Sequence, residues 1–395
     1  MTGPSVVDRS RPPGQSVGSG SLPWAIGQHA GDRPVVILDH AVAVTARERF
    51  SVDAVAEVVV RAAVGWDEVR RITRLVREKG ADSIIVVGGG NAIDAAKLAS
   101  ACAPQEHLLE LLLARARLGG LCAIPEQLWS PMPVVCAPTT FGTGAEVSAV
   151  ACCELSEGGG AAYKCLVGMP SSPVVAAAYE PSMLVAPRPL VLAGAAESWT
   201  RVLGAAIASD SRIGWANDEA RHLVARTGQV AAAALRAGSP SEDTLVSWAL
   251  ASASSHLGWA LRGRGVAPFP LWFVANELSM ELGVTKMEAL SALWPGWVGA
   301  VLEGRDEWGD RARMDEMLEI SGVCGVVDLV DRVRALVPAR RARAALAQGS
   351  DVADVVAARV VARFGNRRPL SRRFTRESVG AVLRGAARRT DEVAA

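Results

Sequence analysis

Two short apolar segments that each run straight into a glycine-containing loop constrain the fold of this chain more than any other feature. Residues 83–87 (SIIVV) precede the glycine triplet 88–90, and residues 133–137 precede the loop 138–146 (PTTFGTGAE). Short β-branched runs of this kind, separated by a helix-forming stretch, are typical of strands in a parallel α/β sheet. Glycine lets a backbone approach a ligand closely, and a helix that starts directly after it offers unpaired N–H groups to a phosphate.

The flanking residues predict further elements of the same kind. Residues 34–38 (PVVIL) have the pattern of another buried strand, and residues 66–79 place apolar side chains at helical spacing until Gly80. Asn91 stands where it can cap the helix that follows the glycines, with Asp94 in the capping-box position. The first half of the chain is therefore predicted to alternate strands and helices.

The second half of the chain has a different pattern. Strand-like runs disappear after about residue 190, where Ala, Leu, Arg and Glu dominate. The predicted helices there cover residues 191–208, 218–237, 271–282, 286–302 and 352–364. We therefore divide the chain into a flexible leader (1–33), an α/β domain (34–190) and an all-helical domain (191–395).

Composition excludes several classes of function. Lys plus Arg number 42 and Asp plus Glu 41, so the chain lacks the basic excess that a nucleic-acid-binding protein usually carries. The charged stretches 303–315 and 367–374 are predicted to be a solvated connection and a solvated surface. No apolar run approaches the ~18 residues of a membrane span, and no secretion signal is visible. We therefore expect a cytoplasmic protein without nucleic-acid or membrane partners, whose seven cysteines are reduced thiols.

Two motifs carry a resemblance to a known family. The strings GGGNAIDAAK (88–97) and PTTFGTGAE (138–146) closely resemble the GGGSxxDxAK and PTTxGTGSE motifs of the iron-containing alcohol dehydrogenases, in the same order. The resemblance continues through Lys164 and the Glu180-Pro181 pair, and covers roughly residues 34–390. It implies the dehydroquinate synthase-like fold, in which an α/β dinucleotide-binding domain and an all-α domain face each other across a cleft.

The resemblance also implies a cofactor site. Its residues by position are Asp39, Gly88, Gly89, Gly90, Asn91, Asp94, Thr139, Thr140, Thr143 and Lys164. Asp39 matches the acidic residue for the adenosine ribose, where a carboxylate accepts bonds from both ribose hydroxyls and repels a 2′-phosphate. We therefore expect NAD rather than NADP, although Asp39 also fits the alternative of an ordinary turn residue at the end of a strand. Asn91 and Ala145 stand where the family usually has Ser.

The metal site of the family is not conserved in this chain. Family members bind one divalent metal with an Asp, a His four residues later and two further His fourteen residues apart. These positions are held here by Glu197, Arg201, Trp272 and Lys286. Of the four, only the carboxylate can bind a metal, since two of the others are cations and Trp offers no lone pair. We expect no metal, and we do not expect His256 to replace the missing ligands.

Fixed positive charge is the predicted substitute for the metal. Glu197, Arg201 and Lys286 sum to +1, as do one carboxylate and a divalent cation. A charge-assisted hydrogen bond from a cation stabilises an alkoxide. Lys286 is the better candidate for the group that takes the alcohol proton, Glu197 would orient the cations, and Trp272 and Asn276 would line the substrate cleft. The alternative is a structural ion cluster that fills an inactive site.

Several functions fit these residues. The first is a metal-independent NAD-dependent oxidoreductase that oxidises an alcohol, and we expect a homodimer. The resemblance extends to daptide-pathway relatives in ribosomal-peptide biosynthesis, which oxidise a C-terminal threonine to a β-keto acid that loses carbon dioxide. A cationic site suits such a carboxylate, but also other anionic alcohols. The alternatives are a catalytically inactive dinucleotide-binding partner subunit, a conventional small-molecule alcohol dehydrogenase or aldehyde reductase, and a sugar-cyclising synthase of the same superfamily.

Overall fold

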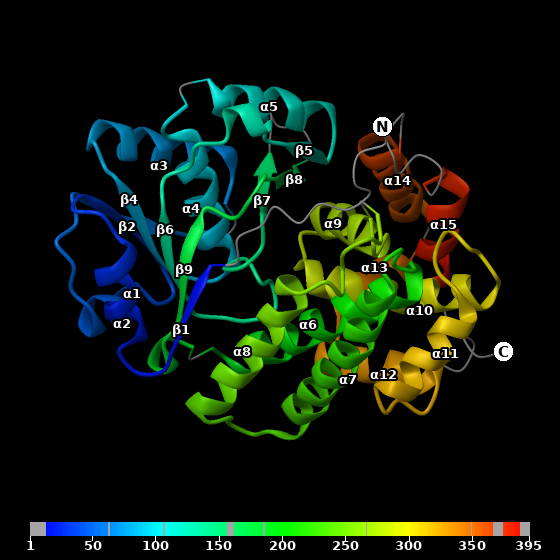
Figure 1. Ribbon diagram of the computed structural model, residues 1–395. Helices are drawn as coiled ribbons and strands as arrows, with labels where there is room; N and C mark the ends of the chain where they lie inside the picture. The colour runs from blue at the N-terminus through cyan, green and yellow to red at the C-terminus, as the bar shows by residue number, and fades with distance from the viewer. Residues whose placement is uncertain are drawn as a thin grey trace.

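An α/β domain and a helical domain lie side by side in the computed structural model (Figure 1). The structure describes residues 13–387 except 62–63, 106, 156–161, 185, 266, 349 and 366–373. The sheet occupies the N-terminal half, and helices follow from Arg188 onward. The predicted fold class, a parallel α/β domain followed by an all-helical one, is confirmed.

Six parallel strands of the described residues form the main sheet. In spatial order they are β1 (Gly14–Val17), β9 (Val174–Tyr179), β6 (Val134–Pro138), β4 (Ser83–Gly88), β2 (Pro34–Asp39) and β3 (Ala56–Val60). The central strands are buried along almost their whole length because helices cover both faces. Their carboxyl ends therefore lie together at one edge, where the two glycine-containing loops begin.

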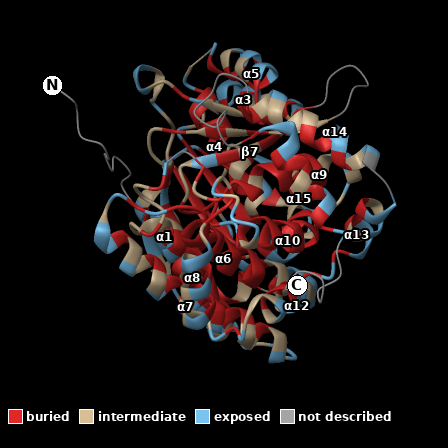
Figure 2. Cartoon of the chain, turned by 90° about the vertical axis from the view of Figure 1, so that its right-hand side faces the viewer, coloured by how far each residue is buried: buried red, intermediate tan, exposed pale blue. Residues whose placement is uncertain are grey.

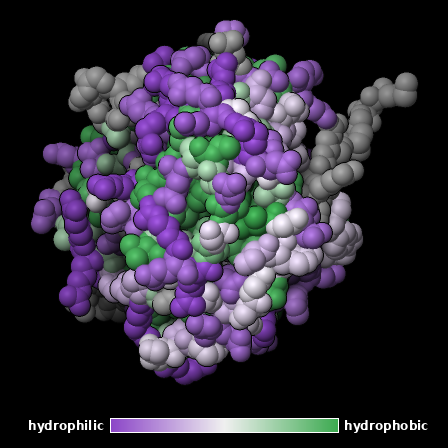
Figure 3. Space-filling view, turned by 90° about the vertical axis from the view of Figure 1, so that its left-hand side faces the viewer, coloured by the Kyte–Doolittle hydropathy of each residue, from purple (hydrophilic) through white to green (hydrophobic). Residues whose placement is uncertain are grey.

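The helices of this domain divide between the two faces of the sheet. They are α1 (Ser21–His29), α2 (Ala43–Arg49), α3 (Trp66–Glu78), α4 (Gly90–Cys102) and α5 (Leu108–Leu118). Alternate residues of β2 enter separate cores: Ile37 packs with α3 and α4, whereas Leu38 packs with α1 and α2. Figure 3 shows the side of the molecule that carries α1 and α2, where apolar surface gathers in the middle of a polar rim.

A smaller sheet extends the α/β domain toward the helices. Within the described residues it holds three strands: β5 (Leu121–Ala123), β8 (Tyr163–Gly168) and β7 (Val150–Leu155). β7 and β8 are antiparallel, and β8 packs against α9 of the helical domain. Lys164 therefore lies where the two domains meet. Two single 3₁₀ turns, η1 (Glu126–Leu128) and η2 (Pro181–Met183), complete this half.

The helical domain is built around two buried helices, α6 and α10, which lie at its centre in Figure 2. Its elements are α6 (Arg188–Ala208), α7 (Gly214–Arg236), α8 (Glu242–Leu257), α9 (Leu271–Leu282), α10 (Lys286–Leu302), α11 (Arg311–Ile320), α12 (Val326–Leu336), α13 (Arg340–Ala347), α14 (Ser350–Val360), a π-helical turn η3 (Val361–Gly365) and α15 (Arg376–Gly385). α6 has the length and composition of a membrane span, but 83% of its apolar window is buried inside the protein. It is therefore a core helix.

Part of the predicted leader is folded. Residues 1–12 lie outside the described residues, but Gly14–Val17 forms an edge strand that pairs with β9, and α1 follows it. The carboxylate of Glu180 accepts a hydrogen bond from the Gly20 N–H, 2.9 Å away, at the start of α1. The prediction of a loose leader through residue 33 was wrong because the partner of β1 lies about 160 residues further along the chain.

Three local predictions also need correction. α4 begins at Gly90 with Gly89 as its N-cap, so Asn91 lies inside the helix and does not cap it. The connection 303–315 is not fully solvated, because Trp308 is completely buried and α11 already begins at Arg311. The predicted helix 352–364 is α14 followed by η3. The basic residues 367–373 lie outside the described residues, and Phe374 beside them is buried.

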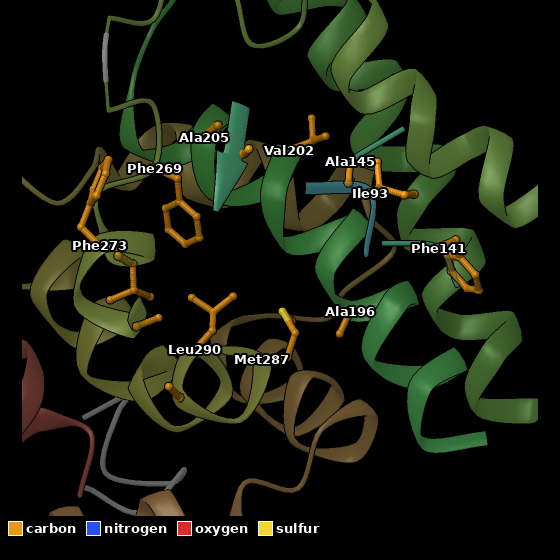
Figure 4. Packing of buried hydrophobic residues seen from close by; sticks show 14 of the residues in the cluster. Ile93, Phe141, Ala145, Ala196, Val202, Ala205, Phe269, Phe273, Met287 and Leu290 are labelled. Carbon is orange, nitrogen blue, oxygen red and sulfur yellow. The ribbon is translucent and has the colours of Figure 1, made fainter. Parts of the chain in front are cut away.

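One apolar core continues beneath both domains. Figure 4 labels Phe141 and Ala145 of the loop after β6, Ala196 of α6 and Met287 of α10, which all belong to one cluster of buried apolar side chains. Both glycine-containing loops and the helices that face them therefore rest on shared buried side chains. This shared core joins the α/β domain to the helical domain.

Candidate active site

The glycine triplet forms a cradle at the carboxyl end of β4. A Cβ atom on Gly88 would lie 2.7 Å from the Ala92 Cβ, and one on Gly90 would lie 2.9 Å from Oγ1 of Thr143. Gly89 is the N-cap of α4 and provides no side chain that caps the first turn of that helix. Glycines at the start of a helix are the arrangement that lets a backbone approach and bind a phosphate.

Polar side chains at or just after the ends of β2 and β6, the two strands on either side of β4, lie beside this cradle. Asp39 ends β2; its Oδ1 accepts from the Ala41 N–H at 3.0 Å and its Oδ2 from the Gly89 N–H at 3.4 Å. A Cβ on Gly89 would lie 3.1 Å from Oγ1 of Thr140, so that threonine faces the same loop. Thr139, which precedes it, is buried. The structure thus brings the predicted acidic residue and the threonines to one site.

Asp94 has a different environment from the one predicted. Its Oδ2 accepts from the Cys152 N–H at 2.9 Å, and its Oδ1 lies 3.0 Å from Nζ of Lys97. Lys97 is fully buried and donates to the carbonyls of Ala145 and Val150, at 3.0 and 2.6 Å. Asp94 and Lys97 therefore hold the backbone of the segment that runs from the loop after β6 into β7. The sequence analysis did not single out Lys97, although it belongs to the first motif.

The predicted catalytic residues come together between α6, α9 and α10. Nζ of Lys286 lies 2.6 Å from Oε1 of Glu197, and a guanidinium nitrogen of Arg201 lies 3.6 Å from the same oxygen. Both cations lie near the Trp272 ring, with Nζ of Lys286 4.1 Å and Cζ of Arg201 5.5 Å from its centre. Glu197 and Arg201 share a helix face at a spacing of four. A capping box of Thr285 fixes Lys286 as the first residue of α10.

Arg201 also reaches the α/β domain. Its guanidinium donates to the carbonyl of Gly142 in the loop after β6, and at 2.9 Å to Oγ of Ser255 on α8. Each of these partners is a neutral acceptor. Arg201 is therefore bound to the loop after β6 as well as to Glu197, and connects this carboxylate to the α/β domain.

Lys164 lies on β8 and Asn276 on α9, two elements that pack against each other. Nζ of Lys164 donates to Oγ of Ser279 on α9 at 3.4 Å and lies 3.9 Å from Oε1 of Glu154 on β7. Oγ of Ser279 in turn donates to the carbonyl of Asn276, whose side chain is buried. The structure therefore places Lys164 against α9, the helix that carries Trp272 and Asn276.

The electrostatics of the cluster keep its carboxylate ionised. Burial opposes the charge of Glu197, but Lys286 and Arg201 outweigh it, and the pKa of Glu197 lies below its usual value. Burial lowers the pKa of Arg201, and Glu197 partly offsets that effect. The side chains of Glu197 and Arg201 are each 7% exposed, whereas that of Lys286 is 26% exposed. Lys286 is therefore the most exposed member of the cluster.

These donors do not fit a divalent metal. The carboxylate of Glu197 already faces two cations, so a metal bound there would stand beside two positive charges. Throughout the part of the chain that the structure describes, no three His, Cys, Asp or Glu side chains gather as a metal-binding group. A metal held by one shared carboxylate lacks the three or four ligands that protein sites supply.

Sequence analysis missed the contribution of α8 to this site. Ser252 Oγ accepts from the Gly142 N–H at 3.1 Å, and Nε2 of His256 lies 3.0 Å from the carbonyl oxygen of Thr143. Ser252, Ser255 and His256 have the i, i+3, i+4 spacing of one helix face. That polar spacing within an otherwise apolar helix was the signal available in the sequence.

Part of the chain is similar in sequence to known proteins. Residues 19–176 match the model of a protein family described as iron-containing alcohol dehydrogenase. The 4-hydroxybutyrate dehydrogenase of Cupriavidus necator is 31% identical over 135 residues, which are 32% of this chain and 33% of that protein. The match therefore spans about a third of the length of that curated relative.

Solved structures extend the similarity of fold to almost the whole chain. The NADH-dependent butanol dehydrogenase A of Thermotoga maritima superimposes with a TM-score of 0.72 at 17% identity, over 95% of this chain and 97% of that one. The sulfoacetaldehyde reductase of Bifidobacterium kashiwanohense, in complex with NAD⁺, gives 0.72 at 15% identity, over 97% and 99%. At this identity the comparison establishes the fold, including that of the helical domain.

Proposed function

We propose that this protein is an NAD-dependent alcohol dehydrogenase that works without a bound metal. Residues 19–176 match the model of the iron-containing alcohol dehydrogenase family, and the chain shares its fold with a solved dehydrogenase and a solved reductase. The observation that carries the proposal is the ion pair between Lys286 and Glu197, 2.6 Å apart, at the position where the family binds its metal. The substitution keeps a positive charge in the cleft and removes the metal ligands.

The residues of the cradle fit NAD. Gly88, Gly89 and Gly90 would hold the pyrophosphate at the start of α4, and Asp39 would accept hydrogen bonds from the adenosine ribose. When bound, NAD⁺ supplies the acceptor for the hydride of the alcohol carbon. The carboxylate of Asp39 repels a 2′-phosphate, which supports NAD over NADP.

The cluster at Lys286 would supply the acid–base chemistry. Nζ of Lys286 is the exposed donor, and it binds the substrate oxygen while Glu197 and the Trp272 ring fix its position. In the reduction direction the ammonium of Lys286 donates a proton to the substrate oxygen. In the oxidation direction the ammonium first releases a proton to solvent, and the resulting amine takes the hydroxyl proton. Arg201 adds positive charge where negative charge develops on the oxygen, in a site largely closed to water.

The substrate class that suits this cluster is an alcohol with an anionic group. Arg201 and Lys286 share one carboxylate, so the cluster carries an excess of one positive charge. The names of two similar proteins point the same way, since 4-hydroxybutyrate carries a carboxylate and sulfoacetaldehyde a sulfonate. The C-terminal threonine of a ribosomally made peptide is one such alcohol. Its oxidation gives a β-keto acid, which releases carbon dioxide, as in the daptide pathways.

An inactive dinucleotide-binding subunit is the second candidate. The observation that favours it is that Glu197, Lys286 and Arg201 already satisfy one another, as a structural ion cluster does. The two candidates differ in turnover and agree on NAD binding, so they are separable by experiment.

The deciding experiment combines binding, metal content and turnover on one preparation. NADH is titrated by fluorescence, metal is measured by mass spectrometry, and oxidation of 4-hydroxybutyrate, 1-butanol and a peptide ending in threonine is followed with and without a chelator. We expect NADH binding, less than one metal per ten chains, and faster turnover of the anionic alcohols, unchanged by chelation. Stoichiometric metal, or activity abolished by the chelator, refutes the metal-independent mechanism. NADH binding without turnover of any alcohol favours the inactive subunit.

We also propose that the protein is a homodimer. Its edge strand β1 is exposed along most of its length, and an exposed strand edge is a surface for pairing. Light scattering on the same preparation gives twice the 41.3 kDa of the chain if the proposal holds.

A further inference from the structure

The segment 142–144 of the loop after β6 is held from the helical domain by hydrogen bonds to its backbone. Oγ of Ser252 accepts from the Gly142 N–H at 3.1 Å, and Arg201 donates to the Gly142 carbonyl. Nε2 of His256 lies 3.0 Å from the Thr143 carbonyl oxygen. Three backbone groups of two consecutive residues are thus bound by side chains from α6 and α8. We call Ser252 and His256, together with Arg201, the loop clamp.

Gly142 and Gly144 pack closely against the helices of the helical domain. Gly142 has φ +113°, and a Cβ there would lie 2.6 Å from Cα of Gly194 on α6. Gly144 has φ +61°, and a Cβ there would lie 2.1 Å from the imidazole of His256. Both glycines combine a left-handed backbone with contact against a helix. His256 therefore packs against the loop as well as bonding to it.

The opposite side of the segment faces the phosphate cradle. Oγ1 of Thr143 would lie 2.9 Å from a Cβ on Gly90, so this side chain stands directly over the start of α4. Any shift of residues 142–144 therefore moves Thr143 relative to the cradle. A displacement of about 1 Å at such a position is enough to slow a reaction between two positioned groups severely.

We propose that Ser252 and His256 are positioning residues, which hold Thr143 in register with the cradle and so fix the cofactor against the substrate cleft. This inference rests on the proposed function and adds to it the part of the site that α8 supplies. His256 acts as a donor, because a carbonyl oxygen accepts hydrogen bonds only, and Nε2 must therefore carry the hydrogen.

The surroundings of His256 favour the neutral form that this role uses. Its pKa is lowered well below the usual value, first by burial and then by the positive charge of Arg201. Lys97 and Lys286 act in the same direction. A neutral imidazole with hydrogen on Nε2 donates to Thr143 without adding another charge beside two cations.

Amide exchange and steady-state kinetics together test the loop clamp. The variants are Ser252→Ala, His256→Gln and His256→Asn; Gln places its amide where Nε2 of His256 lies, whereas Asn reaches only the Nδ1 position. We expect Ser252→Ala and His256→Asn to accelerate exchange in a peptide covering residues 139–147 by about fivefold to tenfold, since each loses one hydrogen bond to the loop. His256→Gln should stay within about twofold of the wild type.

The kinetic readout separates positioning from folding. We expect kcat to fall about tenfold in Ser252→Ala and His256→Asn, with the Kd for NADH within about threefold, because the pyrophosphate cradle is unchanged. Ser254→Ala is the matched control, since Ser254 lies on the exposed face of the same helix and bonds only to its own helix carbonyl at Leu250. Circular dichroism and thermal unfolding check that each variant is folded.

The outcomes distinguish this inference from the proposed function. Unchanged exchange in Ser252→Ala and His256→Asn, or faster exchange with unchanged kcat, overturns the positioning role. Equal losses in His256→Gln and His256→Asn overturn the donor assignment. If the wild-type protein does not bind NADH, the proposed function fails, while exchange that responds to the clamp variants still supports the structural half of the inference.

Discussion

The ammonium of Lys286 is held between the carboxylate of Glu197, 2.6 Å away, and the face of the Trp272 ring, 4.1 Å from its centre. An ion pair and a cation–π contact from two different helices therefore fix one flexible side chain. About a quarter of that side chain remains exposed. A cation with a fixed position and one open side is arranged to bind a developing alkoxide without further reorganisation.

Replacement of Lys286 by Ala should abolish most turnover and leave cofactor binding unchanged. The variant loses the donor to the substrate oxygen, which we expect to lower kcat by about 10²- to 10³-fold. The cradle lies on the other domain, so the Kd for NADH should change by less than about twofold. Stopped-flow turnover and a fluorescence titration give the two numbers.

The control for this variant is Lys79→Ala, at the exposed end of α3. It removes the same charge from the surface and should behave as the wild type. Turnover of Lys286→Ala within threefold of the wild type contradicts the catalytic role. Lys286→Arg keeps the charge but not the shape, and should retain a measurable part of the activity.

Glu197→Gln should destabilise the protein most at neutral pH. The folded-state pKa of Glu197 lies below its ordinary value of 4.5, so its stabilisation is present above that value and is lost as the pH falls through the folded pKa. At pH 7 the variant leaves Arg201 and Lys286 without their shared anion, which should cost about 2–4 kcal/mol of unfolding free energy. Urea titrations at pH 7, 5 and 4 measure the difference, which should shrink toward pH 4. A difference that grows on acidification refutes the assignment.

His256 should make the folded protein sensitive to acid in a different range. Its folded-state pKa lies well below the ordinary 6.5, so the unfolded chain binds a proton on this group first. Stability is therefore lost as the pH falls below about 6.5, by up to about 1.4 kcal/mol per unit for one group. The unfolding free energy of His256→Gln should fall less steeply between pH 6.5 and 5 than that of the wild type. Parallel curves would contradict a neutral His256 in the folded protein.

The sequence was sufficient for those parts of the site that depend on local spacing. Glu197 and Arg201 had to share a face of α6 because they are four residues apart, and the family register placed Lys286 opposite them. The glycine cradle was predictable for the same reason, since a strand, three glycines and a helix are contiguous. The Glu197–Arg201 pair and the glycine cradle are each formed by residues that lie within about ten positions of one another, whereas the placement of Lys286 depended on the resemblance to the family.

The parts that could not be predicted depend on partners far away in the chain. Strand β1 has an ordinary Gly-Ser-rich sequence, and only its pairing with β9 orders it. The bonds from α8 to residues 142–144 join positions more than 100 residues apart. Asp94 was assigned to the cofactor because its motif is close to the cradle, but the side chain points toward Cys152 on β7. The spacing of residues in a motif does not determine in which direction a side chain points in the folded protein.

Asp39→Ser should relax the preference for NAD. The carboxylate lies at the end of β2, beside the Gly89 N–H, where the cofactor ribose is expected. Removing its charge removes the repulsion toward a 2′-phosphate, so the ratio of kcat/KM for NADP to that for NAD should rise about 10- to 100-fold. Asp53→Ser, an exposed residue of the same domain, is the control and should leave the ratio unchanged. An unchanged ratio in Asp39→Ser would mean that Asp39 is a turn residue only.

Glu277 joins the end of the helical domain to the small sheet of the α/β domain. It is fully buried on α9; its Oε1 accepts from Nε of Arg363 at 3.0 Å, and its Oε2 from Nε of Arg359 at 3.2 Å. Arg363 continues to the Lys164 carbonyl at 3.0 Å, and Arg359 to the Ala162 carbonyl at 2.9 Å. The carboxylate thus anchors two cations that hold the strand carrying Lys164.

Replacement of Glu277 should lower the free energy of unfolding far more than replacement of its exposed neighbour Glu281. Glu277→Gln removes the charge that both arginines share in a buried site, and we expect a loss of about 3 kcal/mol in unfolding free energy. The Kd for NADH should rise at the same time, because Lys164 is no longer held against α9. Glu281→Gln is the matched control: it lies one turn further along, is 30% exposed and pairs with Arg359 alone, so it should cost less than about 1 kcal/mol. Urea unfolding and NADH titration of both variants measure the two effects. Equal effects in Glu277→Gln and Glu281→Gln would show that Glu277 contributes no more than Glu281 to joining the two domains.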